Sequence, residues 1–190
     1  FQLQFIDLSF KPFISAILNV SENHLDHHFN MEEYKLCKKN IFKNQSDRDY
    51  LLVSQKELKI NKINPLKINP LKNKKIYSTG NAIFAEKNKL NINELKLYGP
   101  HNIENILFSL NIFTIIKKIE KKQLQVVKDF TPPSHRLEKL KGKIAIFNDS
   151  KSTSPQATGV AINSFSEKIV LIMGGKDKNL DYSSLNKDFK

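Results

Sequence analysis

The chain has 190 residues, of which 39% are hydrophobic and 26% are charged, and its formal net charge is +12. This apolar share is too high for a wholly disordered chain, and no window approaches the roughly 18 consecutive apolar residues of a membrane span. The single cysteine, Cys37, excludes an internal disulfide framework and fits a reducing compartment. The opening Phe1-Gln2-Leu3, without an initiator methionine, predicts a fragment of a longer protein.

The first elements predicted along the chain are a strand, a helix and a second strand. The apolar run at 14–20 indicates a buried strand that ends in a polar loop. Asn30 followed by Glu33 is a helix-start pattern, and this helix is expected to run to about residue 43. Residues 50–54 form the next strand candidate.

A repeat interrupts this pattern, because the pentapeptide Lys-Ile-Asn-Pro-Leu occurs at 62–66 and again at 67–71. Two prolines five residues apart forbid a helix and spoil a central strand, so an exposed basic loop is expected over 56–75. Short strands should follow over 75–97, with a hairpin turn at 87–89.

Two helices are predicted next. The first follows the break at residues 99–102 and has apolar residues at helical spacing from Ile103 to Phe113, and the second covers 121–129. The prolines in 131–133 then predict a domain boundary. Beyond it the pattern is α/β: a strand at 143–148, a helix that starts at Ser154-Pro155, and a second strand at 168–173.

Lys38 is the first residue that suggests chemistry. On a helical wheel it lies in the middle of an apolar face formed by Tyr34, Cys37, Ile41 and Phe42. A lysine there must extend its amine to water, be neutralised, or serve a purpose. The extended lysine is the simpler interpretation, and a chemically modified or paired lysine is the functional one.

Two polar loops follow predicted strands. Residues 19–28 contain three histidines and two carboxylates, which suit a divalent metal but lack the spacing of a structural zinc site. Residues 148–154 join a strand to a helix start, an arrangement that presents backbone N–H groups and Lys151 to an anion. The chain contains no Walker P-loop pattern. Exposed histidines and an ordinary polar loop remain the plain alternatives.

Taken in order, seven segments resemble the motifs of the Mur ligases of peptidoglycan synthesis. The D-S-K-x-T stretch within them resembles the member that adds D-glutamate. The matching segments are 1–3 (F-Q-L), 18–26 (L-N-V-S-E-N-H-L-D), 34–41 (Y-K-L-C-K-K-N-I), 99–105 (G-P-H-N-I-E-N), 135–138 (H-R-L-E), 148–153 (N-D-S-K-S-T) and 174–182 (G-G-K-D-K-N-L-D-Y).

This resemblance implies an α/β fold in two pieces. Residues 1–132 would be the second part of a central ATPase-type domain, a mixed sheet with helices. Residues 133–190 would be the truncated start of a Rossmann-like C-terminal domain, the glutamate-ligase domain. The Walker P-loop and a further metal-binding glutamate would lie before Phe1, so this polypeptide alone is expected not to catalyse the reaction.

The resemblance also implies roles for individual residues. Lys38 would be carbamylated by CO₂ and, with His24, would hold Mg²⁺. The other implied site residues are Asn102, Asn105, Arg136 and Asp149 for ATP, and Ser150, Lys151, Thr153 and Lys178 for the acyl phosphate and the incoming amino acid.

The activity implied is ATP-dependent ligation of D-glutamate to UDP-N-acetylmuramoyl-L-alanine through an acyl phosphate. A cytoplasmic bacterial enzyme is expected, monomeric when full length and without nucleic-acid or membrane partners. Asn23 departs from a position that is often acidic in the family.

Alternatives from other classes stay open. The nearest is a sister Mur ligase or a folylpolyglutamate synthase, and a degenerate scaffold is a further one. The net charge also permits a basic nucleic-acid-binding module. However, only Arg48 and Arg136 supply the guanidinium forks on which such readers usually rely, so a solvated basic face is the commoner meaning.

Overall fold

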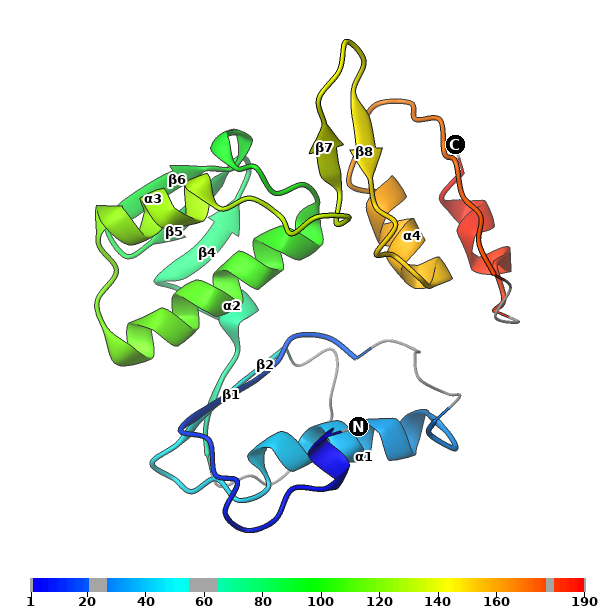
Figure 1. The fold of residues 1–190 in the computed structure, drawn as a ribbon. Helices are drawn as coiled ribbons and strands as arrows, with labels where there is room; N and C mark the ends of the chain where they lie inside the picture. The colour runs from blue at the N-terminus through cyan, green and yellow to red at the C-terminus, as the bar shows by residue number, and fades with distance from the viewer. Residues whose placement is uncertain (1, 21–26, 55–64, 177–179, 190) are drawn as a thin grey trace. The chain divides into compact units, whose positions relative to one another are not determined.

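The computed structural model describes residues 2–20, 27–54, 65–176 and 180–189. The chain forms two compact units, Phe1–Lys89 with Asn105–Glu120 and Leu90–Glu104 with Lys121–Lys190. The α-helices of the described residues are α1 (Met31–Lys39), α2 (Pro100–Ile116), α3 (Lys121–Asp129) and α4 (Pro155–Ile162) (Figure 1). Helix α2 begins in the second unit and continues in the first.

A parallel sheet forms the centre of the first unit. Its strand order is β1 (Ile14–Ile17), β2 (Tyr50–Val53), β3 (Leu66–Ile68), and the chain passes from β1 to β2 through α1. Leu51, Leu52 and Val53 of β2 are 0% exposed, because a central strand of a covered parallel sheet is buried on both faces. The two strands predicted here are confirmed, although β1 ends three residues earlier than expected.

The start of helix α1 follows the predicted cap. The Asn30 side-chain oxygen accepts a hydrogen bond from the Glu33 backbone N–H, and Glu33 Oε2 accepts one from the Phe29 N–H. These bonds satisfy amide groups that have no partner inside the helix. The helix ends at Lys39, earlier than predicted, because residues 40–42 tighten into a 3₁₀ turn.

The prediction of an exposed loop at the repeat is wrong from Leu66, the last residue of the first copy, through the second copy. Leu66–Ile68 pair with β2 as an edge strand, and Pro70 is fully buried. An edge strand tolerates flanking prolines because only one of its sides needs hydrogen bonds. Residues 62–64 of the first copy lie outside the described residues.

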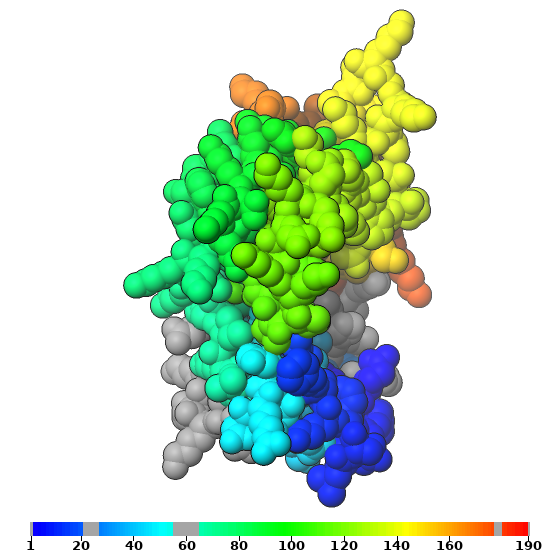
Figure 2. Space-filling model, turned by 90° about the vertical axis from the view of Figure 1, so that its left-hand side faces the viewer, coloured from blue at the N-terminus to red at the C-terminus, as the bar shows by residue number. Residues whose placement is uncertain are grey.

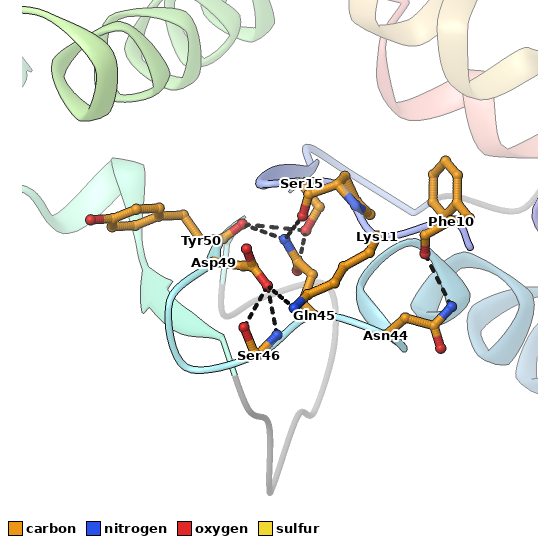
Figure 3. A network of polar contacts seen from close by, with 9 residues as sticks. Phe10, Lys11, Ser15, Asn44, Gln45, Ser46, Asp49 and Tyr50 are labelled. Carbon is orange, nitrogen blue, oxygen red and sulfur yellow. Dashed lines mark hydrogen bonds and ion pairs between the residues drawn. The ribbon is translucent and has the colours of Figure 1, made fainter. Parts of the chain in front are cut away.

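A buried amide ties β1 to β2 (Figure 3). Gln45 is 2% exposed, and its Nε2 donates to the carbonyls of Pro12 and Tyr50 while its Oε1 accepts from Ser15 Oγ. Beside it, the Ser46 backbone N–H, the Ser46 hydroxyl and the Lys11 ammonium, 3.6 Å away, hold the pKa of Asp49 below its usual range despite burial.

Replacing Gln45 by alanine is expected to lower the free energy of unfolding by about 2–3 kcal/mol, because buried carbonyl and hydroxyl groups lose their partner. Urea unfolding measures the change. The matched control is Asn44→Ala. Asn44 donates two hydrogen bonds in an exposed setting, so its loss should cost less than about 1 kcal/mol. Equal costs for the two variants would contradict this assignment.

The second sheet is antiparallel, with the strand order β4 (Ile76–Thr79), β5 (Ala82–Ala85), β6 (Asn88–Asn91). The predicted hairpin is confirmed, but its turn is Glu86-Lys87, one residue earlier than expected, with Glu86 at φ 54°. The side-chain amide of Asn73, just before β4, donates to the buried Asn111 of α2. This bond anchors the sheet to the helix.

The second unit contains a two-stranded antiparallel hairpin, β7 (Glu138–Leu140) and β8 (Ile146–Asn148). The exposed residues between these strands project from the surface in yellow (Figure 2). Near the C-terminal end of β8, Phe147 packs on Tyr98 and Phe165, with ring centroids 5.0 and 4.7 Å away. This aromatic cluster fixes the end of β8, where the polar loop begins.

The strand predicted at 168–173 is absent from the structure, where these residues form no ladder. Val170 and Ile172 are 91% and 92% exposed. An apolar run shows only that a segment is hydrophobic. A strand also requires a neighbouring strand whose backbone groups complete its hydrogen bonds. The predicted helix start at Ser154-Pro155 is confirmed, since Ser154 Oγ caps α4. Among the described residues, no helix is both long and apolar enough to cross a membrane.

Candidate functional site

Lys38 lies on the apolar face of α1, as the helical wheel predicted. Tyr34 and Cys37 on this face are buried, and Tyr34 belongs to the core cluster with Ile17 and Leu51. The Lys38 side chain is half-buried, and its ammonium lies over the Tyr34 ring, 5.1 Å from the centroid. The cation therefore has an aromatic partner at the edge of the core.

The histidine loop is described only in part, because His24 lies outside the described residues. His27 Nε2 lies 2.9 Å from Gln4 Oε1. His28 is buried against Tyr34, and its Nδ1 lies 3.8 Å from a Glu33 carboxylate oxygen. Within the described ranges, no three histidine, cysteine or acidic side chains form a metal-binding group. The metal site formed by His24 and Lys38 therefore stays a prediction.

Arg136 is presented by a tight turn in the second unit, which we call the Arg136 turn (residues 133–138). Its backbone N–H donates to the Pro133 carbonyl at 3.2 Å, and its side chain is exposed. The residues on either side, His135 (φ 69°) and Leu137 (φ 47°), are in the left-handed region, which residues with a Cβ seldom adopt. The side chain of Leu137 is buried and anchors the turn.

The loop after β8, residues 148–153, which we call the Asp149 loop, is hydrogen-bonded to this turn. Asp149 Oδ1 accepts from the Leu137 N–H at 2.9 Å, and the Lys151 N–H donates to the His135 carbonyl at 3.0 Å. Asn148 Nδ2 lies 2.9 Å from His135 Nδ1. The structure thus places Arg136, Asp149 and Lys151, taken from two separate motifs, in one arrangement.

Three further side chains of the Asp149 loop face solvent. Ser150, Lys151 and Thr153 are exposed, while the Ser150 backbone N–H donates to Asn148 Oδ1. These groups can donate to an anionic ligand at the start of α4. Lys178 lies outside the described residues.

The start of α2 carries the two predicted asparagines. Asn102 Nδ2 donates to the Tyr98 carbonyl at 2.7 Å, and the Asn105 carbonyl accepts from Ser109 Oγ. Residues at i and i+3 share one helix face, so both side chains point to a common side of α2.

His101 is a residue of this region to which the sequence assigned no role. It lines a cleft of about 460 Å³ with Glu104, Gly159 and Asn163 of the second unit. Its Nδ1 is buried without a hydrogen-bond partner among the described atoms. Burial lowers the pKa of His101, and the Asp149 and Glu104 carboxylates oppose this shift. The only signal in the sequence was its place between Gly99 and Asn102.

The stability of the protein is expected to fall as pH decreases below 6.5, the ordinary pKa of histidine. Because the folded pKa lies below that of the unfolded chain, the unfolded chain binds the proton first. Above pH 6.5 the contribution of neutral His101 to the stability of the folded state is complete. This contribution is lost as the pH falls from 6.5 to the lower pKa that His101 has in the folded chain. Urea midpoints of the wild type and His101→Gln at pH 7.5 and 5.5 measure the difference. Identical pH dependence in the two chains would contradict it.

The sequence profile of the Mur ligase middle domain matches residues 2–113, which is more than half of the chain. The chain therefore belongs to the Mur ligase family. Solved structures agree with this fold. MurF of Acinetobacter baumannii matches with a TM-score of 0.62 and 13% identity, over 80% of this chain and 36% of that one. MurF of Thermotoga maritima, solved in complex with ADP, matches with a TM-score of 0.58 and 16% identity, over 81% of this chain and 39% of that one.

Particular relatives are named UDP-N-acetylmuramoylalanine--D-glutamate ligase. That of Bacillus mycoides (strain KBAB4) is 34% identical over 201 residues, which cover 100% of this chain and 44% of the relative. That of Clostridium tetani (strain Massachusetts / E88) is 37% identical over 187 residues, which cover 92% of this chain and 40% of the relative. The chain thus spans less than half the length of these relatives.

Proposed function

We propose that this chain acts as part of an ATP-dependent ligase. This enzyme adds D-glutamate to UDP-N-acetylmuramoyl-L-alanine in the cytoplasm during bacterial peptidoglycan synthesis. The names of the relatives support the substrates. The observation that carries the proposal is the hydrogen bonding of the Asp149 loop to the Arg136 turn, because it brings two motifs of the family into one site. A domain boundary at residue 132 is part of the same proposal.

The residues of the second unit suit a nucleotide. The exposed Arg136 guanidinium offers a planar fork for phosphate oxygens, and Asp149 can accept a hydrogen bond from a hydroxyl group. Asn102 adds an amide group from the start of α2 in the same unit, and the resemblance assigns Asn105 to the nucleotide as well. ATP would supply the phosphoryl group that turns the substrate carboxylate into a good acyl donor.

Lys38 as the bare ammonium seen here cannot bind a cation. As a carbamate it would offer two oxygens of the kind that Mg²⁺ prefers, and His24 would add an imidazole. Lys38 would thus contribute to a magnesium site only after its amine has reacted with CO₂. Its place on the edge of the core restricts where the modified group can reach.

Binding of the acyl phosphate and of the amino acid that accepts the acyl group is assigned to Lys151, Ser150, Thr153 and Lys178. The amine of D-glutamate attacks the acyl phosphate, a C–N bond forms, and inorganic phosphate leaves with the electron pair of the broken C–O bond. Cationic and hydroxyl groups stabilise the negative charge that builds up during this attack. Lys151 and Thr153 are exposed and can approach the carboxylates of an acidic amino acid.

The test uses the product of the genomic reading frame that contains this sequence. Phosphate release from ATP is measured with UDP-N-acetylmuramoyl-L-alanine and with D-glutamate, L-alanine or L-lysine as the acceptor. D-Glutamate should be preferred by at least about tenfold. L-Alanine and L-lysine have no second carboxylate, so the lysines of the site would stay unpaired when either of them binds. Preference for another amino acid would indicate a sister ligase. Tight, steeply salt-dependent retention on DNA would favour the nucleic-acid-binding alternative.

A further inference from the structure

The backbone around Arg136 is held in an unfavourable conformation. His135 and Leu137 both have positive φ angles, of 69° and 47°. Side chains with a Cβ adopt this region rarely, and it persists only where surrounding contacts enforce it. Some groups must therefore stabilise this turn against relaxation to an ordinary loop.

Glu138 supplies one of these contacts. Its Oε2 accepts the His135 backbone N–H at 2.8 Å, while the His135 ring nitrogen Nδ1 is farther from the same oxygen, at 3.8 Å. The shorter contact is to the backbone, so the carboxylate acts mainly on the main chain of the turn. Glu138 is the first residue of β7 and pairs with Asn148, which fixes its backbone in the ladder.

Asp149 supplies the matching contact on the other side of Arg136. Its Oδ1 accepts the Leu137 N–H, while the backbone N–H of Lys151 donates to the His135 carbonyl. Two carboxylates thus bind the amide groups immediately before and after Arg136. Hydrogen bonds to a charged acceptor are stronger than neutral ones, which suits a strained turn.

We propose that Glu138 is a positioning residue for Arg136: its carboxylate holds the His135 amide, maintains the left-handed turn and so directs the Arg136 guanidinium. Asp149 performs the same task from the opposite side with one oxygen, which leaves its second oxygen for a ligand. The proposal rests on the nucleotide-binding role of Arg136 stated above, but the conformation of the turn can be measured without any ligand.

The experiment compares the 190-residue chain with Glu138→Ala and Glu138→Gln. Alanine removes the acceptor, whereas glutamine retains a carbonyl oxygen at the same reach. Glu167→Ala is the control, because it removes one exposed negative charge elsewhere in the second unit. Amide hydrogen exchange at His135 and Leu137 is measured by NMR.

Exchange at His135 and Leu137 should accelerate about 10- to 100-fold in Glu138→Ala, as expected for the loss of one charged hydrogen bond. Glu138→Gln should restore most of the protection, and Glu167→Ala should not change it. Unchanged exchange in Glu138→Ala, or equally fast exchange in the alanine and glutamine variants, would overturn the proposal.

A second measurement connects the turn to function. The product of the genomic reading frame that contains this sequence is titrated with ADP, and the side-chain Nε–H signal of Arg136 is followed with that of Arg48 as an internal reference. The Arg136 signal should respond, and Glu138→Ala should weaken the apparent affinity about tenfold. If the wild-type Arg136 signal does not move, the nucleotide role fails, whereas the exchange data still decide whether Glu138 holds the turn.

Discussion

Replacing Lys38 by alanine is expected to abolish the D-glutamate-adding activity of the protein that contains this chain. The variant has no amine to react with CO₂, so it can form no carbamate at this position. We expect a loss of at least about 10²–10³-fold in kcat, the size reported when one electrostatic stabiliser is removed from an active site. Added bicarbonate should not restore activity. The measurement is D-glutamate-dependent phosphate release from ATP.

The matched control is Lys35→Ala on the same helix. Both side chains are half-buried lysines of α1, but the functional role is assigned to Lys38 alone. Lys35→Ala should retain activity within about threefold of the wild type, because it removes no group that is assigned to the site. Full activity of the Lys38→Ala variant would refute the carbamate role.

Replacing Gly99 by alanine is expected to lower the free energy of unfolding of the second unit by about 2–4 kcal/mol. Gly99 has φ 89°, and an added Cβ would collide with Ser164 Oγ and lie 2.8 Å from the His101 ring. Ser164 Oγ is itself bonded to the Val160 carbonyl, so it does not move away freely. The loss is measured by chemical denaturation, with unfolding monitored through amide hydrogen exchange in the second unit.

Gly80→Ala separates backbone strain from collision. Gly80 also has a positive φ, of 53°, but an added Cβ there would meet nothing within 4 Å. It should therefore show only the conformational cost, about 1 kcal/mol. If Gly99→Ala cost no more than Gly80→Ala, close packing around Gly99 would be contradicted.

Several elements were predictable from short stretches of sequence. The cap at Asn30 and the Ser154-Pro155 helix start follow from local chemistry, since each depends on residues within one helical turn. The helix at 121–129 was also predicted with its observed bounds. The hairpin before α2 was found for the same reason, with an error of one residue in its turn. Lys38 was placed on the correct helix face by periodicity alone.

Elements that depend on a distant partner were predicted less well. Residues 66–68 became a strand because β2 offers a free edge, a fact that no local pattern contains. Residues 168–173 have a strand-like composition but make no ladder. The positions of His24 and Lys178 lie outside the described residues, so their assignments rest on the resemblance.

The sequence by itself determined the family motifs, the residue types of the site and the helices that carry them, because these are written in short, contiguous stretches. Only the tertiary structure decided that the Asp149 loop bonds to the Arg136 turn, that Glu138 holds an amide of that turn, and that the amine of Lys38 lies over Tyr34. The left-handed angles beside Arg136 show why for the Asp149 loop: neither His135 nor Leu137 favours these angles, and the hydrogen bond between Leu137 and Asp149, twelve residues apart, forms only when the chain folds.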